Sequence, residues 1–320
     1  MIIQQIVKSN FGMKDIKEII KQKMPPILVW NPWSDEVSPG IGYLDYPVIF
    51  PDNICPFNCT FTHNRELFLS ENNASTIIII LHELNRIDSW PKNRREEQNY
   101  MMFTVESPIE TIPFYKKILL IEISATYRLD SDVYMPYDAL TKITKETPKE
   151  YIWDQKEISE LIKINVVGEC SGVKCGRECY ERELEQHFFY LAFENSICIQ
   201  YVTEKFWNSL RSITLPIVLS RSVFKGMDIP SNSFIAVDDF NSINELVEYL
   251  KNLKNDTEKY LKHFEWTKTY TKRKFCSDYS PICKICEYAT KHFEEKRKSK
   301  FNFKKFWNDE HCNNNFVMCY

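Results

Sequence analysis

The stretch "FFYLAFENSICIQYVTEKFW", residues 188–207, carries the main local signal for the fold. Its aromatic and aliphatic run, 188–193, predicts a strand buried on both faces of a parallel sheet. A polar turn follows, and Thr203 is a candidate N-cap for a helix whose apolar residues recur at helical spacing. Because ligands of open α/β sheets bind at the carboxyl ends of strands, near helix N-termini, the pattern predicts a phosphate-binding site. In the competing interpretation, Glu204 and Lys205 are an ordinary solvated helix start.

The composition is that of a folded chain with no strong overall charge. Its 320 residues predict about two domains, and 43% hydrophobic residues are enough for packed cores. A net charge of −3 gives no global attraction to nucleic acid or membranes. Eleven cysteines, with N-x-[ST] sequons at Asn58, Asn73 and Asn255, favour a secretory compartment. Residues 1–30 hold neither a signal peptide nor a membrane span, so either an anchor is missing from this chain or the protein is cytosolic.

Short apolar runs predict strands along most of the chain. They are "PILVW" (26–30), "STIIIIL" (75–81), "NYMMFTVESP" (99–108), "INVVG" (164–168), "HFFYLAFENS" (187–196), "LPIVLS" (215–220) and "SFIAVDD" (233–239). Helical spacing predicts helices over 243–250 and 256–266, and the charged segment 141–164 is the expected domain junction. These elements indicate two successive α/β domains. With seven glycines and no G-x-G-x-x-G or P-loop, classical dinucleotide and Walker-type sites are excluded.

A long motif series resembles the α1,3-fucosyltransferases, glycosyltransferase family 10. The series comprises residues 189–219, residues 234–266, "FTVESP" (103–108) and "ATYRLDSDVYMPY" (125–137). The resemblance covers most of residues 27–288 and implies a GT-B fold, in which two Rossmann-like domains face each other across a cleft. The implied organisation is a stem-like segment (1–26), an acceptor-side α/β domain (27–145), a GDP-fucose-binding α/β domain (146–290) and a basic C-terminal tail (291–320). A solvated terminal face is the expected form of the basic stretch 291–305.

The resemblance also implies roles for five residues. Asn195, Tyr201, Glu204 and Lys205 match positions that bind GDP-fucose, and Glu106 matches the general base. A lysine and helix N–H groups near a departing diphosphate are chemically suited to this role. A carboxylate that takes the acceptor's proton, in one displacement at the anomeric carbon, inverts a β-linked donor to an α-linked product.

The implied activity is transfer of fucose from GDP-fucose to a hydroxyl of N-acetylglucosamine in glycoprotein glycans, in α1,3 linkage. No cofactor is expected beyond this donor substrate, and Mn²⁺ is expected to be at most stimulatory. Family members are usually Golgi type II membrane proteins whose catalytic part is luminal. The expected partners are therefore the donor, the glycan acceptor and, through an anchor absent from this chain, the Golgi membrane, with no nucleic acid.

Two further patterns could be mistaken for metal sites. Asp130-x-Asp132 has the spacing with which another glycosyltransferase fold holds Mn²⁺, but its setting resembles a motif of family 10, so a structural or acceptor-cleft role is expected, with Arg128 as an ion-pair partner. Cys283-x-x-Cys286 lacks the second pair or the histidines of a zinc site, and the resemblance implies disulfides near this end of the chain. Cys170, Cys175 and Cys179 crowd one segment, and their pairing is open.

The chain departs from the family pattern in one long segment and three positions. Between 138 and 165, the family's strand and the diphosphate-binding arginine that follows it are not recognisable. At single positions, Asp138 stands where glycine is usual, Gln200 where aspartate is common, and Ser220 where glycine ends a strand. Two alternatives to an active transferase therefore stay open. One is a relative that binds glycan or nucleotide without turnover, and the other is a chain from which an encoded segment is missing.

Overall fold

The chain contains two compact units, each described here by itself. The computed structural model describes residues 25–31, 47–48, 55–57, 59–63, 65, 77–82, 98–111, 121–155, 184, 187–273, 281–292 and 302–313. Unit 1 consists of Met1–Met135 and Asp278–Asp309, and unit 2 consists of Pro136–Ser277 and Glu310–Tyr320. Unit 1 is thus built from two stretches far apart in the sequence.

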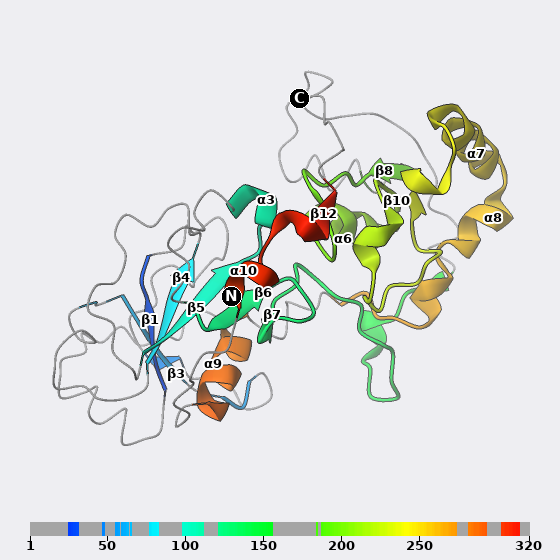
Figure 1. Ribbon diagram of the computed structural model, residues 1–320. Coiled ribbons are helices and arrows are strands. Elements are labelled where there is room, and N and C mark those ends of the chain that lie inside the picture. The colour runs from blue at the N-terminus through cyan, green and yellow to red at the C-terminus, as the bar shows by residue number, and fades with distance from the viewer. Residues whose placement is uncertain are drawn as a thin grey trace. The chain divides into compact units, whose positions relative to one another are not determined.

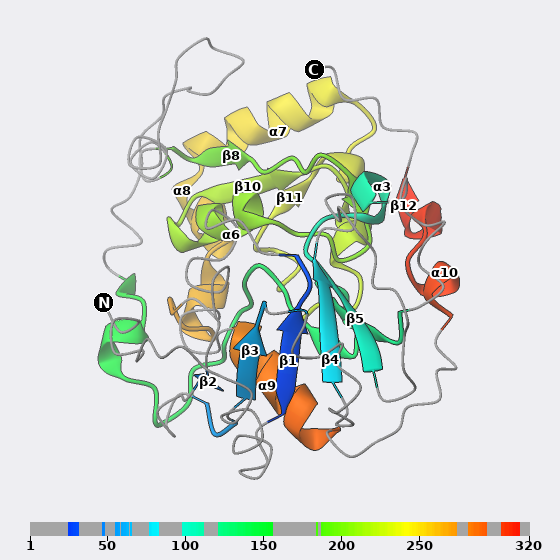
Figure 2. The same cartoon turned by 90° about the vertical axis from the view of Figure 1, so that its left-hand side faces the viewer.

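Unit 1 is organised around one mainly parallel sheet (Figures 1 and 2). The strand order is β2-β3-β1-β4-β5-β6-β7, and only the β2–β3 pairing is antiparallel. The strands are β1 (Pro26–Val29), β2 (Pro47–Val48), β3 (Cys59–Thr62), β4 (Ile77–His82), β5 (Gln98–Thr104), β6 (Ile123–Thr126) and β7 (Val133–Tyr134). Every residue of β1, β3, β5 and β6 is buried, as expected for parallel strands covered on both faces.

Helix α9 (Pro281–Lys291) returns to the sheet of unit 1, where it contacts β3 and β7 (Figure 1). Cys283 and Cys286 form disulfides with Cys55 and Cys59, and Ile285 between them is fully buried. These bonds confirm that this cysteine pair is used for disulfides. The covalent link explains why α9 belongs to unit 1, although the predicted range 146–290 placed it with the second sheet.

The basic stretch near the C-terminus is partly packed into unit 1. Helix α10 (Phe303–Phe306) buries Phe303, and the indole of Trp307, fully buried, donates from Nε1 to Thr111 Oγ1 at 2.8 Å. Thr111 ends helix α3 (Pro108–Thr111). Within the basic stretch 291–305, the expectation of a solvated face was therefore wrong for Phe303, which is buried, whereas Lys304 and Lys305 are exposed. Trp307 lies just beyond that stretch.

Unit 2 contains a smaller parallel sheet of order β11-β10-β8. Its strands are β8 (Phe189–Leu191), β10 (Leu215–Val218) and β11 (Ile235–Ala236). The prediction that residues 188–193 form a strand buried on both faces was wrong in its burial. Within the described sheet β8 pairs with β10 on one side, and its residues are half-buried or exposed, with Leu191 59% exposed. Strand 164–168, also predicted, lies outside the described residues.

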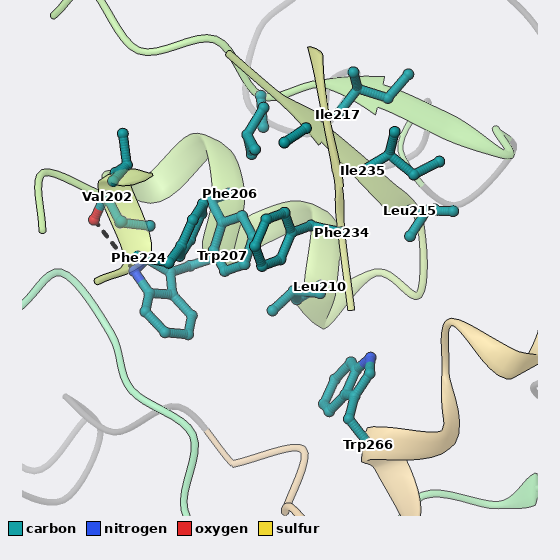
Figure 3. Packing of buried hydrophobic residues seen from close by; sticks show 14 of the residues in the cluster. Val202, Phe206, Trp207, Leu210, Leu215, Ile217, Phe224, Phe234, Ile235 and Trp266 are labelled. Carbon is teal, nitrogen blue, oxygen red and sulfur yellow. Dashed lines mark hydrogen bonds between the residues drawn. The ribbon is translucent and has the colours of Figure 1, made fainter. Parts of the chain in front are cut away.

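The core of unit 2 lies between this sheet and helix α6 (Glu204–Arg211). Figure 3 shows Phe206, Phe224 and Phe234 gathered against strand residues such as Ile217. The rings of Phe224 and Phe234 stack with centroids 4.2 Å apart, and Phe206 lies 4.8 Å from Phe224. The aromatic cluster fixes the inner face of α6 against the sheet and so determines where the helix begins.

The remaining elements of unit 2 complete the described fold. Helices α7 (Ile243–Asn255) and α8 (Thr257–Lys262) match the predicted helical segments and begin at the caps Ser242 and Asp256. The antiparallel pair β9 (Ile197–Cys198) and β12 (Cys312–Asn313) is joined by a disulfide between Cys198 and Cys312. Short 3₁₀ segments are η4 (Lys149–Tyr151), η6 (Arg221–Phe224), η7 (Val237–Asp239), η8 (Glu265–Lys268) and η10 (Asp309–His311).

The two sheets confirm the α/β class. The cleft between two facing domains, and the acceptor-side and donor-binding roles of the ranges 27–145 and 146–290, stay predictions. The unit boundary falls at residues 135 and 136, just before the expected junction 141–164, and the stem-like segment 1–26 lies almost wholly outside the described residues. Among the residues that the structure describes, no helix is both long and apolar enough to pass through a bilayer.

Candidate functional site

The start of helix α6 lies just beyond the carboxyl ends of β8 and β10. Thr203 is the N-cap, as predicted, with extended backbone angles (φ −92°, ψ −173°), and its side-chain oxygen accepts from the backbone N–H of Lys205 at 3.5 Å. The helix then places Glu204 and Lys205 in its first turn, and its inner face carries the buried Phe206, Trp207 and Leu210. A positive dipole end and a lysine side chain therefore occur together, which suits an anionic ligand.

Glu194, three residues beyond β8, places a carboxylate beneath this helix start. Its side chain is only 9% exposed, and both oxygens are bonded to Thr203: Oε1 accepts from the backbone N–H and Oε2 from the hydroxyl, each at 2.7 Å. Burial raises the pKa of Glu194, while the hydrogen bonds from Thr203 and the charge of Lys205 act in the opposite direction. The sequence interpretation did not include Glu194; a charged residue at the end of a long uncharged run was the available signal.

The ammonium of Lys205 lies among three oxygen atoms. Its Nζ is 3.2 Å from Thr203 Oγ1, 3.3 Å from Glu204 Oε1 and 3.5 Å from Glu194 Oε2, and the side chain is 36% exposed. Burial acts to lower the pKa of Lys205, but the two carboxylates outweigh burial, and the pKa is raised. Lys205 is thus held as a cation that is still accessible to solvent.

The four residues predicted to bind the donor lie in one short segment of unit 2. Tyr201 is buried and lines a small apolar hollow, Asn195 is exposed in the loop next to Glu194, and Glu204 is exposed beside Lys205. The hollow lies against the inner face of α6, and its lining residues are Ala192, Glu194, Ser196, Ile197, Tyr201, Val202, Phe206, Val218, Leu219, Val223 and Phe224. The structure therefore brings Tyr201, Glu194 and the start of α6 together.

Glu106, the predicted base, lies in unit 1. It follows the carboxyl end of β5 by two residues, is half-buried, and precedes the fully buried Ser107 at the start of α3. Its backbone N–H donates to Thr104 Oγ1 at 3.2 Å. A carboxylate at the carboxyl end of a parallel strand is in the usual place for a functional group in an α/β sheet.

Asp130 and Asp132 have structural partners. Arg128 donates to both carboxylate oxygens of Asp130, at 2.8 and 2.6 Å, and Asp132 accepts from the backbone and hydroxyl of Ser124, both at 2.9 Å. The ion-pair role expected for Arg128 is confirmed, and its side chain is 11% exposed. In the described part of the chain, no cluster of three or more His, Cys, Asp or Glu side chains has an arrangement that would hold a metal ion.

Two of the departures from the family pattern have local explanations. Ser220 has extended backbone (φ −144°, ψ 135°), so this position has no requirement for a positive φ that only glycine would meet easily. Its hydroxyl donates to Asp238 at 2.6 Å and accepts from the backbone N–H of Ser222 at 3.3 Å, which starts η6. Gln200, another of the departures, has a positive φ of 65°, as does Ile213 with a φ of 54°. The segment 156–183, with Cys170, Cys175 and Cys179, lies outside the described residues.

Two protein-family models together match most of the chain. Residues 143–306 match the model described as glycosyltransferase family 10 (fucosyltransferase) C-term, and residues 22–138 match the one described as fucosyltransferase, N-terminal. The chain therefore belongs to glycosyltransferase family 10, the fucosyltransferases. The boundary between the matches, 138–143, lies close to the start of unit 2.

Three curated relatives illustrate the similarity. The chain is 32% identical to glycoprotein 3-alpha-L-fucosyltransferase A of Drosophila melanogaster over 92% of its own length, and it spans 61% of that relative. It is 33% identical to 4-galactosyl-N-acetylglucosaminide 3-alpha-L-fucosyltransferase 9 of Mus musculus, covering 78% of this chain and 75% of the relative. It is 30% identical to alpha-(1,3)-fucosyltransferase fut-5 of Caenorhabditis elegans, covering 72% and 69%.

Solved structures of an α1,3-fucosyltransferase also match this chain over almost its whole length. One of them covers 98% of this chain and 96% of its own, with a TM-score of 0.48 and 18% sequence identity. Another, with GDP-fucose, covers 94% and 97%, with a TM-score of 0.45 and 17% identity.

Proposed function

We propose that this chain transfers fucose from GDP-fucose to a hydroxyl of N-acetylglucosamine in glycoprotein glycans, with an α1,3 linkage. The observation that carries the proposal is the cation of Lys205 at the capped start of α6, beyond the carboxyl ends of parallel strands. Membership of the family supports the reaction class. The relatives' names supply the linkage and, for the mouse relative, an N-acetylglucosaminide acceptor.

In this proposal the donor's diphosphate binds at the start of α6. Lys205 supplies one positive charge, and the helix N-terminus adds partial positive charge, so the negative charge that develops on the departing GDP is stabilised. Asn195, Tyr201 and Glu204 complete the donor site, where Glu204, exposed beside Lys205, accepts hydrogen bonds from ribose or fucose hydroxyls. The diphosphate competes with the exposed carboxylate of Glu204 for the ammonium of Lys205.

Glu106 acts as the general base. As the acceptor oxygen attacks the anomeric carbon of fucose, its proton passes to the Glu106 carboxylate, and the bond between the anomeric carbon and the β-phosphate oxygen breaks. A single displacement from the opposite face inverts the configuration at this carbon. The protonated base returns its proton to solvent after the products leave.

The central test is release of GDP from GDP-fucose, measured with and without an N-acetylglucosamine-bearing acceptor. We expect release only when acceptor is present. Glu106→Gln should lower kcat by about 10²- to 10⁴-fold while leaving GDP affinity unchanged. An absence of turnover with every such acceptor, in a chain that still binds GDP, would favour the alternative of a relative that binds nucleotide or glycan without catalysis.

Binding of GDP is expected to be weak but measurable by calorimetry. Lys205→Ala should reduce it by about 10- to 100-fold, since one charge-assisted contact is lost. The matched control is Lys251→Ala, which removes an exposed lysine paired with Glu248 on α7. Equal affinity in the two variants would contradict the assignment of Lys205.

The proposal includes catalysis without an essential metal ion. Lys205 and the start of α6 provide positive character for the leaving group, and Asp130 and Asp132 are bonded to Arg128 and Ser124. We expect EDTA to leave most of the activity and Mn²⁺ to be at most stimulatory. Loss of activity with EDTA, restored by Mn²⁺, would contradict this. The proposed location is the luminal face of the Golgi.

A further inference from the structure

Glu194 is a buried carboxylate that no part of the proposed reaction uses. Its side chain is 9% exposed, and it bonds to Thr203 through both oxygens at 2.7 Å. A buried carboxylate is costly unless several donors satisfy it. Here the donors are the backbone and hydroxyl of the N-cap residue of α6, together with the Lys205 ammonium at 3.5 Å. All three come from the segment that presents the cation.

The direction of these hydrogen bonds follows from the chemistry of the groups. An ionised carboxylate only accepts, and a threonine hydroxyl has one proton, so Thr203 Oγ1 donates that proton to Glu194 Oε2. The lone pairs of the hydroxyl are then left to face Lys205, whose Nζ lies 3.2 Å away and whose backbone N–H lies 3.5 Å away. Glu194 therefore sets the orientation of the hydroxyl, and the oriented hydroxyl accepts from the ammonium.

We propose that Glu194 is a positioning residue that holds the Lys205 ammonium, through the Thr203 hydroxyl, in place for the diphosphate of the donor. This inference rests on the proposed function, because it deepens the donor site described above. Glu194 itself lies beneath the helix start and does not touch the diphosphate. Its effect on nucleotide binding is exerted through Lys205.

Glu194→Gln tests the inference with little change of shape. The amide keeps one accepting oxygen, for the Thr203 N–H, but its –NH₂ group donates toward the hydroxyl and forces that proton to turn toward Lys205. We expect GDP affinity to fall by about 10-fold, which is the effect of one charged hydrogen bond. The control is Glu245→Gln, which removes a carboxylate from the first turn of α7, and it should leave GDP affinity unchanged.

A double-mutant cycle separates positioning from a purely structural role. If Glu194 acts through Lys205, Glu194→Gln should change GDP affinity less than about 2-fold in a chain that already carries Lys205→Ala. If Glu194 only stabilises the loop, the two effects multiply. Because Lys205→Ala alone weakens GDP binding strongly, the affinity of the Lys205→Ala chains for GDP is measured by titration up to millimolar GDP. Multiplying effects would overturn the inference.

The hydroxyl gives a conservative rescue. Thr203→Ser keeps both the N-cap oxygen and the bridging proton, so GDP affinity should stay within about 2-fold of the parent. Thr203→Val has nearly the same shape and lacks the hydroxyl, so it should weaken GDP binding as Glu194→Gln does. Equal affinities for the serine and valine variants would show that the hydroxyl does not transmit the effect.

A second measurement does not depend on nucleotide. Without the Glu194 charge, Lys205 loses one of the two carboxylates that favour its ammonium form, so its amine should react faster with an acylating reagent. We expect the acylation rate of Lys205, followed by mass spectrometry without GDP, to rise at least 3-fold in Glu194→Gln and not in Glu245→Gln, because that rise corresponds to a pKa change of about half a unit. If the parent chain binds GDP but the acylation rate of Lys205 is unchanged in Glu194→Gln, the positioning role of Glu194 is overturned and the proposed function is not. Absence of GDP binding by the parent chain would overturn the proposed function.

Discussion

Asp138 and Arg211 form a buried ion pair in unit 2, with side chains 6% and 7% exposed. Arg211 donates to Asp138 Oδ2 and to the carbonyl oxygens of Ala139 and Thr271, each at 2.9 Å. The guanidinium at the end of α6 thus binds two chain segments that are distant in sequence. Asp138, the residue that stands where glycine is usual, has a defined partner in this chain.

Removing one member of this pair should destabilise unit 2 strongly. We expect Asp138→Ala to lower the free energy of unfolding by about 3–5 kcal/mol, because Arg211 is then left buried without its counter-charge. Asp138→Asn should have a smaller effect, since the amide oxygen still accepts from the guanidinium. Denaturant unfolding of the full chain measures both.

The matched control for this buried ion pair is an exposed ion pair on α7. Lys251 and Glu248 are 2.8 Å apart, with side chains 64% and 65% exposed, and Lys251→Ala should change the free energy of unfolding by less than about 1 kcal/mol. If Asp138→Ala had an effect no larger than this control, the buried pair would not contribute to stability as argued.

The buried carboxylate of Glu194 also predicts a pH dependence. Burial raises the pKa of Glu194 above its ordinary value of 4.5, so the folded protein holds this proton more tightly than the unfolded chain. The contribution of this group to stability is full below pH 4.5 and is lost as the pH rises through the raised folded-state pKa. We expect the free energy of unfolding of the parent, minus that of Glu194→Gln, to fall as the pH rises above about 4.5. A difference that grew with pH would indicate a lowered pKa instead.

The residues at the candidate site were predictable to different degrees. Lys205 and Thr203 followed from a local pattern, namely a cap, a first turn and an apolar helix face, which short-range sequence determines. Glu194 was missed because its burial depends on the helix start folding over it, which is a tertiary contact. The cap that Ser220 forms at the start of η6, through Ser222 and Asp238, was also missed, because Asp238 is a partner distant in sequence.

Among the elements, long and strongly patterned segments were predicted best. β1, β4, β5, β10, α6 and α7 all fall within the predicted segments or extend one end of them by a few residues. β3 and β6 were missed as separate strands because their sequences, "CTFT" and "ISAT", are short and half polar. Their burial comes from pairing with neighbouring strands rather than from an apolar run.

The two disulfides that fix α9 should not contribute additively to stability. Cys55–Cys283 and Cys59–Cys286 close nearly the same loop, with sequence separations of 228 and 227. Once one is formed, the other closes only a short additional loop. The chain-entropy treatment then gives about 2 kcal/mol for loss of either bond and about 8 kcal/mol for loss of both. Denaturant unfolding of paired Cys→Ala variants measures this.

The third disulfide provides the control for this prediction. Cys198–Cys312 lies in unit 2 and closes a different loop, with a separation of 114. Its removal by paired Cys→Ala substitution should add to the removal of either bond in unit 1. Equal additivity among all three bonds would contradict the shared-loop argument.

At the scale of the whole molecule, the sequence predicted two α/β domains in order, and the structure has two units that are each built from two separate stretches of the chain. The strand patterns identify both sheets, but they do not show that residues 278–309 return to the first one. That return depends on the disulfides from α9 to Cys55 and Cys59, and on the burial of Phe303 and Trp307. Cys55 and Cys59, and Thr111 as the partner of Trp307, all lie far away in the sequence. Connectivity of this kind cannot be read from a single sequence.

The discontinuity of unit 1 has a consequence for biosynthesis. A ribosome releases Cys55 and Cys59 early, but their partners on α9 emerge only after residues 136–277 have been made. The first two thiols must therefore stay reduced, or in exchangeable bonds, while residues 136–277 are made. Oxidation of unit 1 is then a late event of maturation, and a chain whose translation stops before α9 leaves both cysteines open to the wrong partner.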